Sequence, residues 1–316
     1  MKVYNIELNE DLFMLECINS ITYENPLFSK SNLEYQKYYR EDITESTNIS
    51  FAIRNSKNKL LYLFVGYKHL TEKSLEFSNY GLPIVTFEFK PTPIEKKIII
   101  NEILKRLDFD SVIIYNQNKI KHLDVFSSIL SKKYKSPFLS IISSVNLLQD
   151  YNMIKQSYRK SYKSLINKFS KSINTEVYNS DNINKNIYKS FKDLHFKESG
   201  RITRSLSTWE QHYKMILSND AVLICAEHDK IIIGASLFIN SKNSVYYGVS
   251  ASDKGFKQNK PITHLIIDRA ILFYKECGYS RLILGPYEPF STDEKLRGIS
   301  SFKSAFSNEK IIKINF

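Results

Sequence analysis

The sequence has 316 residues, of which 42% are apolar, and its formal net charge is +12 at neutral pH. This length suits two domains of about 150 residues, each with its own core. The longest apolar runs, LLYLFVG and IIIGASLFI, are far shorter than the roughly 20 residues of a membrane helix. The N-terminal MKVYNIELNEDLF carries acidic residues where a signal peptide would be apolar. We therefore expect a soluble, cytoplasmic protein with no transmembrane segment.

Cysteine content and charge limit the function further. Cys17, Cys225 and Cys277 lie far apart without a metal-ligand spacing, so neither a disulfide scaffold nor a metal site is expected. Cys225 lies in an apolar strand, where a thiol is usually a packing residue. The positive charge favours an anionic partner, but it does not distinguish nucleic acid, phosphate-bearing cofactors, nucleotide sugars and anionic lipid. Abundant lysine, asparagine and isoleucine are also typical of an AT-rich genome, which is a second explanation for the charge.

Two regions of the chain predict the same order of elements. In residues 51–116, FAIRN and LLYLFVGY flank a turn, followed by GLPIVTF, a loop with two prolines, the apolar-periodic IEKKIIINEILKRL and SVIIY. In residues 222–286, VLICAE and IIIGASLFI flank a turn, followed by SVYYGVSA, a loop, ITHLIIDRAILFYKECG and RLILG. Each copy is therefore a hairpin, a third strand, a helix and a fourth strand. We expect two tandem domains of the α/β (α+β) class, at residues 1–149 and 150–316.

Between the copies, residues 151–175 contain six basic residues and no acidic one. Ile154, Tyr158, Tyr162, Leu165, Phe169 and Ile173 recur at helical spacing, so one face of a helix would be apolar. Lys155, Arg159 and Lys163 form a parallel charged row. The segment is either an ordinary docking helix with a solvated face or an anion-binding face beside an inter-domain cleft.

A second predicted helix, INKNIYKSFKDLHFKES, leads into a group of polar and aromatic side chains around Gly200, which has no counterpart in the first copy. His195 could be a base, a ligand or a hydrogen-bonded helix-end residue. Arg201 and Arg204 could converge on a phosphate or carboxylate, or form surface ion pairs. Trp209 could be a stacking platform or a core residue, and Glu198 a general base or an exposed carboxylate. The asymmetry between the copies places the expected site in the second half.

The third strand of the second copy ends in YYGVSASD, and the loop DKGFKQNKP then leads to a helix. A helix N-terminus suits phosphate binding, and Lys254, Lys257 and Lys260 add positive charge there. Pro261 fits the first helical turn. The single glycine argues against a tight backbone cradle. Tyr246 and Tyr247 are expected on opposite faces of the strand, so only one of them can line a cleft.

Several of these segments together resemble the FemAB-like branch of the GNAT-fold acyltransferases, in particular members found in bacterial surface-polysaccharide clusters. They are residues 159–167 (RKSYKSLIN), His195 with residues 200–205 (GRITRS), residues 208–211 (TWEQ), Tyr246 with Tyr247, Lys260 with Pro261, and His264. The resemblance covers most of residues 150–306, and the first copy matches only in element order. It implies tandem GNAT-like domains, the first degenerate, each with a mixed, partly splayed β-sheet flanked by helices. Relatives transfer an acyl group from acyl-CoA, or an aminoacyl group from charged tRNA, to an amine or hydroxyl.

The resemblance also implies roles for individual residues. Asp253 or Glu198 would be the base, and Tyr246 or Tyr247 would protonate the leaving group. The strand ending at Ala251 would hold the donor carbonyl and its developing oxyanion. The implied residues are Glu198, Asp253, Tyr246, Tyr247 and His195 for catalysis; Arg159, Arg201, Arg204, Trp209 and Gln211 for substrate binding; and Val249, Ser250, Ala251, Lys254, Lys257, Lys260 and His264 for the co-substrate.

The sequence does not select a single donor or acceptor. CoA-using GNAT enzymes usually carry a glycine-rich pyrophosphate loop, which SDKGFKQNKP does not match, so acyl-CoA (acetyl-CoA) and aminoacyl-tRNA are both expected as possible donors. The basic segment favours tRNA. The expected acceptor is a sugar, a nucleotide sugar or a lipid-linked glycan used in surface-polysaccharide biosynthesis. The alternative function is a non-catalytic binding or scaffold protein with a basic inter-domain cleft; no metal is expected, and the oligomeric state stays open.

Overall fold

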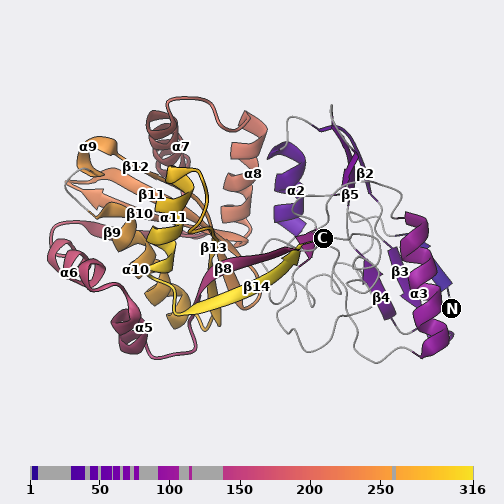
Figure 1. Cartoon of the computed structure of the whole chain (residues 1–316). Coiled ribbons are helices and arrows are strands. Elements are labelled where there is room, and N and C mark those ends of the chain that lie inside the picture. The colour runs from indigo at the N-terminus through magenta and orange to yellow at the C-terminus, as the bar shows by residue number, and fades with distance from the viewer. Residues whose placement is uncertain are drawn as a thin grey trace. The chain divides into compact units, whose positions relative to one another are not determined.

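The computed structural model describes residues 2–5, 30–39, 43–48, 51–58, 60–64, 67–71, 75–77, 92–106, 114–115, 138–257 and 261–315. The chain forms two units, both drawn in Figure 1. One unit consists of Met1–Ile21, Arg40–Ser140 and Ile312–Phe316, and the other of Thr22–Tyr39 and Ile141–Ile311. Residues 22–39 and 141–149 therefore belong to the same unit as the second copy, although they precede residue 150 in the sequence.

The second unit is built on a mixed sheet with the strand order β14-β8-β13-β12-β11-β10-β9. Its strands are β8 (Phe138–Asn146), β9 (Asn174–Tyr178), β10 (Ala221–His228), β11 (Ile231–Asn240), β12 (Ser244–Ser252), β13 (Arg281–Tyr287) and β14 (Glu309–Asn315). The strands from β9 to β12 are antiparallel, and β13 runs parallel to β12. The predicted second copy, with its hairpin, third strand, helix and fourth strand, is confirmed.

Helices flank both faces of this sheet, and the expected mixed α/β class is confirmed. They are α2 (Lys30–Tyr39), α5 (Tyr151–Ser157), α6 (Lys160–Phe169), α7 (Lys185–Ser199), α8 (Leu206–Leu217), α9 (Lys254–Lys257), α10 (Ile262–Glu276) and α11 (Glu294–Ser304). Their ends follow from local side chains. Asn184, Ser205 and Asp293 accept hydrogen bonds from free N–H groups in the first turns of α7, α8 and α11. Gly200 ends α7 in the left-handed conformation, with φ of 67°.

The sheet separates two cores, and successive side chains of β10 pack alternately into one core and the other. Val222, Ile224 and Ala226 pack with α5, α6 and α10, whereas Leu223 and Cys225 pack with α2, α7 and α8 on the opposite face. A strand buried on both faces needs a continuous apolar run, which is why VLICA carries no polar residue. The prediction that Cys225 is a packing residue is confirmed, because its side chain is fully buried.

The basic segment at residues 151–175 differs from the single helix that its periodicity suggests. It forms α5 and α6 with a break at Tyr158, whose backbone is extended, and then continues into β9. The Tyr158 hydroxyl donates a hydrogen bond to Asp268 of α10 over 3.1 Å, and the N–H of Arg159 donates to the carbonyl of Ala305. These contacts hold Tyr158 and Arg159 against α10 and the end of α11. The chain therefore bends at this point and does not continue as one straight helix. The apolar face is nevertheless buried at Ile154 and Ile166.

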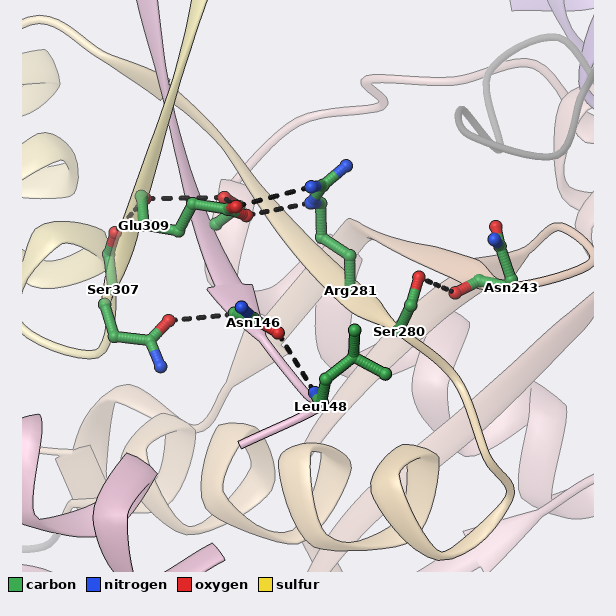
Figure 2. A network of polar contacts seen from close by, with 9 residues as sticks. Asn146, Leu148, Asn243, Ser280, Arg281, Ser307 and Glu309 are labelled. Carbon is green, nitrogen blue, oxygen red and sulfur yellow. Dashed lines mark hydrogen bonds and ion pairs between the residues drawn. The ribbon is translucent and has the colours of Figure 1, made fainter. Parts of the chain in front are cut away.

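A network of polar contacts joins β14 to β13 and β8, as Figure 2 shows. Arg281 of β13 donates to both carboxylate oxygens of Glu309, over 2.8 and 3.3 Å. Ser144 of β8 donates to the same carboxylate over 3.0 Å. The backbone N–H of Asn146 donates to the side chain of Asn308 over 2.8 Å. Strand β8, which precedes the second copy in the sequence, is thereby held between β13 and the C-terminal strand.

The first unit contains two small sheets, ordered β1-β3-β4 and β2-β5-β6. Its elements are β1 (Lys2–Asn5), β2 (Ile43–Asn48), β3 (Phe51–Arg54), β4 (Leu60–Phe64), β5 (Tyr67–Thr71), β6 (Leu75–Phe77), α3 (Pro93–Arg106) and β7 (Ile114–Tyr115). The predicted hairpin of the first copy is the antiparallel pair β3 and β4. Its predicted helix is α3, and its predicted fourth strand ends in β7. The predicted third strand, GLPIVTF, lies outside the described residues.

Candidate active site

The second unit contains a cleft of about 1260 Å³. One wall is formed by the end of α7 and the following loop, the floor includes β12, and the other wall is formed by the start of α10 and by α11. Tyr39 of α2 also contributes to the lining. The cleft therefore lies in the part of the chain that carries the predicted cluster around Gly200.

Strands β12 and β13 separate beside this cleft. They pair in parallel only where Ser244–Tyr246 lies opposite Arg281–Ile283. Each strand then has a bulge, since the register of β12 with β11 shifts at Gly248 and that of β13 with β8 shifts before Gly285. Bulges bend a strand and increase its twist, so a bulge in each strand just beyond the paired stretch favours separation of the two strands. The expected splay of the central strands is therefore present in this unit.

The bulge at Gly248 also decides which side chains of β12 face the cleft. Simple alternation would place Tyr247, Val249 and Ala251 on one face. The extra residue shifts the alternation, so Tyr247, Ser250 and Ser252 line the cleft. Val249 and Ala251 pack in the opposite core, where Tyr246 also lies. Only one of the two tyrosines lines the cleft, as expected, and it is Tyr247, whose pKa is raised by burial.

Glu198 approaches the splayed end of β12 from α7. Its Oε2 accepts a hydrogen bond from the backbone N–H of Ser252 over 2.8 Å, and the residue lines the cleft. Asp253, the other predicted base, is not among the lining residues of the cleft. Its carboxylate accepts from Lys197 over 2.6 Å and from the N–H of Gly255, and the bond from Lys197 lowers its pKa.

The loop between α7 and α8 lines the cleft with Arg201, Ile202, Thr203 and Arg204. Gly200 ends α7 and Ser205 begins α8, so the loop is short and both of its ends are fixed by helix caps. Arg204 lies 3.1 Å from the Nε2 of His195, which also lines the cleft. Arg201 is exposed at the rim.

Trp209 and Gln211, which the resemblance implies for substrate binding, lie behind this loop rather than in the lining. Trp209 is 2% exposed and packs edge-on against His195 and Phe191. Gln211 is also buried, and its amide donates to Glu34 of α2 over 3.3 Å. Both residues therefore pack behind the wall of the cleft and support it.

The opposite wall begins at the first turn of α10, where His264 lines the cleft. His264 packs edge-on against Tyr162 and Phe302, with ring centroids 4.2 and 5.0 Å apart, and burial lowers its pKa to about 4. Arg159 lies over the ring of Tyr162 and donates to Ser301, outside the cleft lining. Lys254 and Lys257 bound the short helix α9, and Lys260 lies outside the described residues.

Helix α11 forms the rest of this wall, and the sequence analysis did not identify it. Five residues at helical spacing face the cleft: Lys295, Gly298, Ile299, Phe302 and Lys303. Lys303 reaches the splay, because its Nζ lies 2.7 Å from the position that a Cβ on Gly285 would occupy. Burial lowers the pKa of Lys303 to about 8. The recurrence of Ile299, Phe302 and Phe306 in the sequence was the signal that could have revealed the helix.

Two properties of the described residues bear on the site. No helix in the described ranges is both long and apolar enough to cross a bilayer. The same ranges contain no group of three or more histidine, cysteine, aspartate and glutamate residues arranged to hold a metal ion.

Comparison with known proteins defines the fold. No family model and no curated protein matches the sequence. Among solved structures, FemX is 12% identical, with a TM-score of 0.71 over 99% of this chain and 97% of its own. L-PGS from Bacillus licheniformis is 13% identical, with a TM-score of 0.58 over 99% of this chain and 93% of its own. A tandem GNAT protein from the clavulanic acid biosynthesis pathway is 8% identical, with a TM-score of 0.52 over 100% and 98%. The chain therefore has the FemX-type GNAT fold, and the expected resemblance is confirmed at the level of the fold.

Proposed function

We propose that this chain, which shares its fold with FemX and with a tandem GNAT protein, is an acyltransferase that works in the cleft beside β12 and β13. The observation that carries this proposal is the splay of these strands. Beyond Tyr246, β12 has no ladder with β13, and the predicted base Glu198 is hydrogen-bonded to the same stretch at Ser252. Backbone N–H groups in such a gap can stabilise a developing oxyanion.

In the proposed reaction, an amine or hydroxyl of the acceptor attacks the carbonyl carbon of the donor. A C–N or C–O bond forms, and the bond from that carbon to the thiol sulfur of acyl-CoA, or to the ribose oxygen of aminoacyl-tRNA, breaks. The nucleophile loses a proton, for which Glu198 is the best-placed base. The ion pair with Lys197 and the lowered pKa make Asp253 a weaker base.

The leaving group needs a proton, and the cleft offers two donors for it. Tyr247 is buried with a raised pKa, whereas burial lowers the pKa of Lys303 to about 8. Lys303 is therefore the stronger acid, and in its charged form it also stabilises negative charge in the splay. We assign this role to Lys303 and a supporting one to Tyr247.

The lining of the cleft supports an anionic and hydroxyl-rich ligand. It carries four cations, Arg201, Arg204, Lys295 and Lys303, against the single carboxylate of Glu198. Both proposed donors are anionic. Ser199, Thr203, Ser250, Ser252 and Thr263 add hydroxyl groups suited to a polyol. We therefore propose a sugar acceptor, free, nucleotide-linked or lipid-linked, in cytoplasmic steps of surface-polysaccharide biosynthesis.

The test begins with the donor. Purified protein is incubated with acetyl-CoA, with longer acyl-CoA or with a mixture of charged tRNA, and its thermal unfolding is compared with that of the free protein. The stabilising donor is then supplied with amino sugars and nucleotide sugars, and mass spectrometry detects the acylated product. Stabilisation with no product from any acceptor would favour a binding or scaffold protein. Wild-type turnover in both Glu198→Ala and Lys303→Met would overturn the site assignment.

A further inference from the structure

Arg204 lies in the cleft wall in contact with neutral hydrogen-bonding groups only. Its Nε donates to the hydroxyl of Tyr35 over 3.5 Å. Its Nη1 lies 3.1 Å from His195 Nε2 and donates to Thr203 over 3.3 Å. Within the described part of the chain, no carboxylate lies within ion-pair distance of Arg204. A guanidinium that lines a cleft without a carboxylate partner keeps its charge available for a ligand.

Aromatic rings restrict this guanidinium further. Its central carbon lies 5.5 Å from the centroid of the Tyr39 ring and 5.8 Å from that of Trp209. Tyr35 itself stacks on the fully buried ring of His212, with centroids 4.4 Å apart. Arg204 is therefore held by partners that are themselves packed in the core.

The contact with Arg204 fixes the chemistry of His195. A guanidinium donates and never accepts, so His195 Nε2 must be the acceptor, and the ring must be neutral with its proton on Nδ1. Nδ1 is buried and has no hydrogen-bond partner in the described structure. Burial, with the nearby charge of Arg204, lowers the pKa of His195 to about 4, in agreement with a neutral ring. Neither ring nitrogen has a lone pair left with which to remove a proton from a substrate.

The donors of Arg204 can also be counted. A guanidinium has five N–H groups. The contacts with Tyr35, His195 and Thr203 occupy three of them, which leaves both N–H groups of Nη2 without a partner in the described structure. Two N–H groups on a fixed cation suit oxygen atoms of a phosphate or a carboxylate.

We propose that Arg204 is a preorganised subsite for an anionic group of the ligand, a phosphate or a carboxylate, and that His195 is a positioning residue for Arg204 rather than a base. The inference rests on the proposed function only in taking the cleft as the ligand site. Anion binding can be measured without any acyl transfer, so an experiment can contradict the anion subsite without contradicting the acyltransferase function, and the reverse.

The test uses isothermal titration of the full-length protein with inorganic pyrophosphate and, in a second arm, with citrate. A preference for one of the two identifies phosphate or carboxylate as the natural group. Arg204→Met is expected to weaken binding of the preferred anion at least tenfold. Arg269→Met removes a cation of α10 that does not line the cleft and is expected to change affinity less than threefold. His195→Gln keeps an acceptor for Arg204 and should stay near wild type, whereas His195→Phe should lose about as much as Arg204→Met.

The proposal is overturned if Arg204→Met binds both anions as the wild type does, or if His195→Phe is folded and binds normally. Nitrogen-15 spectra of the wild-type histidines provide a readout that needs no variant. They should show His195 as the neutral Nδ1–H tautomer from pH 5 to pH 9, and titration of this ring near neutral pH would contradict the role. With a transfer assay, a positioning role predicts that His195→Gln retains kcat, whereas a base role predicts its loss.

Discussion

The carboxylate of Glu198, at the end of α7, accepts a hydrogen bond over 2.8 Å from the backbone N–H of Ser252, at the end of β12. This bond ties the predicted base to the strand that opens away from β13. A carboxylate held by a backbone donor has a fixed orientation, and its oxygens are the acceptors to which a nucleophile can pass a proton.

Replacing Glu198 by glutamine should therefore abolish proton removal while keeping the size of the side chain. We expect turnover with the donor and acceptor identified by the binding assay to fall about 100-fold or more, which is the usual contribution of a general base. Glu210→Gln, on the exposed side of α8, is the matched control and should keep full activity. Equal rates for the two variants would rule out the base role.

Lys303 should impose an alkaline limit on activity. If its charged form stabilises the oxyanion and protonates the leaving group, the rate should fall as the pH rises through its lowered pKa of about 8. Lys303→Arg should move this limb to higher pH, because arginine stays protonated. Lys303→Met should lose most of the rate and the limb with it. Lys295→Met, on the same helix face, should keep the alkaline limb at the same pH as in the wild type, whatever its effect on ligand binding. A wild-type profile in Lys303→Met would contradict the role of Lys303.

The same lysine should reduce the stability of the fold. Its folded pKa of about 8 lies below its ordinary value of 10.5, so the unfolded chain binds more protons between these values. Stability should therefore rise with pH through this window and be lowest below about pH 8. Lys303→Met should remove a penalty on the order of 3 kcal/mol, and calorimetry at pH 7 should show a melting temperature several degrees higher. A lower melting temperature would mean that the amine has a stabilising partner.

Much of the second unit could be predicted from the sequence because its elements carry local signals. The apolar run VLICA, the cap residues Asn184 and Ser205, and Gly200 at the end of α7 each act over a few residues. The order of elements in residues 222–286 was therefore correct. The cluster around Gly200 also identified one wall of the cleft.

The rest depended on contacts between distant residues. The shift of alternation at Gly248 placed Ser250 and Ser252 in the cleft and moved Val249 and Ala251 into a core, and a bulge of this kind has no reliable sequence signal. Lys303 reaches the splay only because α11 packs beside β13, which the sequence analysis did not foresee. The neutral state of His195 follows from its contact with Arg204.

Gly285 should be intolerant of a side chain. Its φ of 106° is a conformation that residues with a Cβ rarely adopt, and an added Cβ would lie 2.7 Å from Lys303 Nζ. The lysine can move aside, so the main cost of Gly285→Ala is backbone strain of about 1–3 kcal/mol. Gly298→Ala is the control, because Gly298 is helical with no atom within 4 Å of the new Cβ. It should gain up to about 1 kcal/mol. Equal effects of the two substitutions in chemical denaturation would show that β13 relaxes freely at Gly285.

Arg281 should anchor the C-terminal strand. It donates to both carboxylate oxygens of Glu309, and the two side chains are 28% and 29% exposed. Arg281→Met leaves Glu309 with the hydroxyl of Ser144 but without its cation, so we expect a loss of about 1–3 kcal/mol in the free energy of unfolding. Arg269→Met breaks a pair with Glu276 on the surface of α10, at 3.9 Å, and should cost less than about 0.5 kcal/mol. Hydrogen exchange should show faster opening of β14 in Arg281→Met alone, and unchanged protection there would mean that backbone pairing suffices to hold the strand.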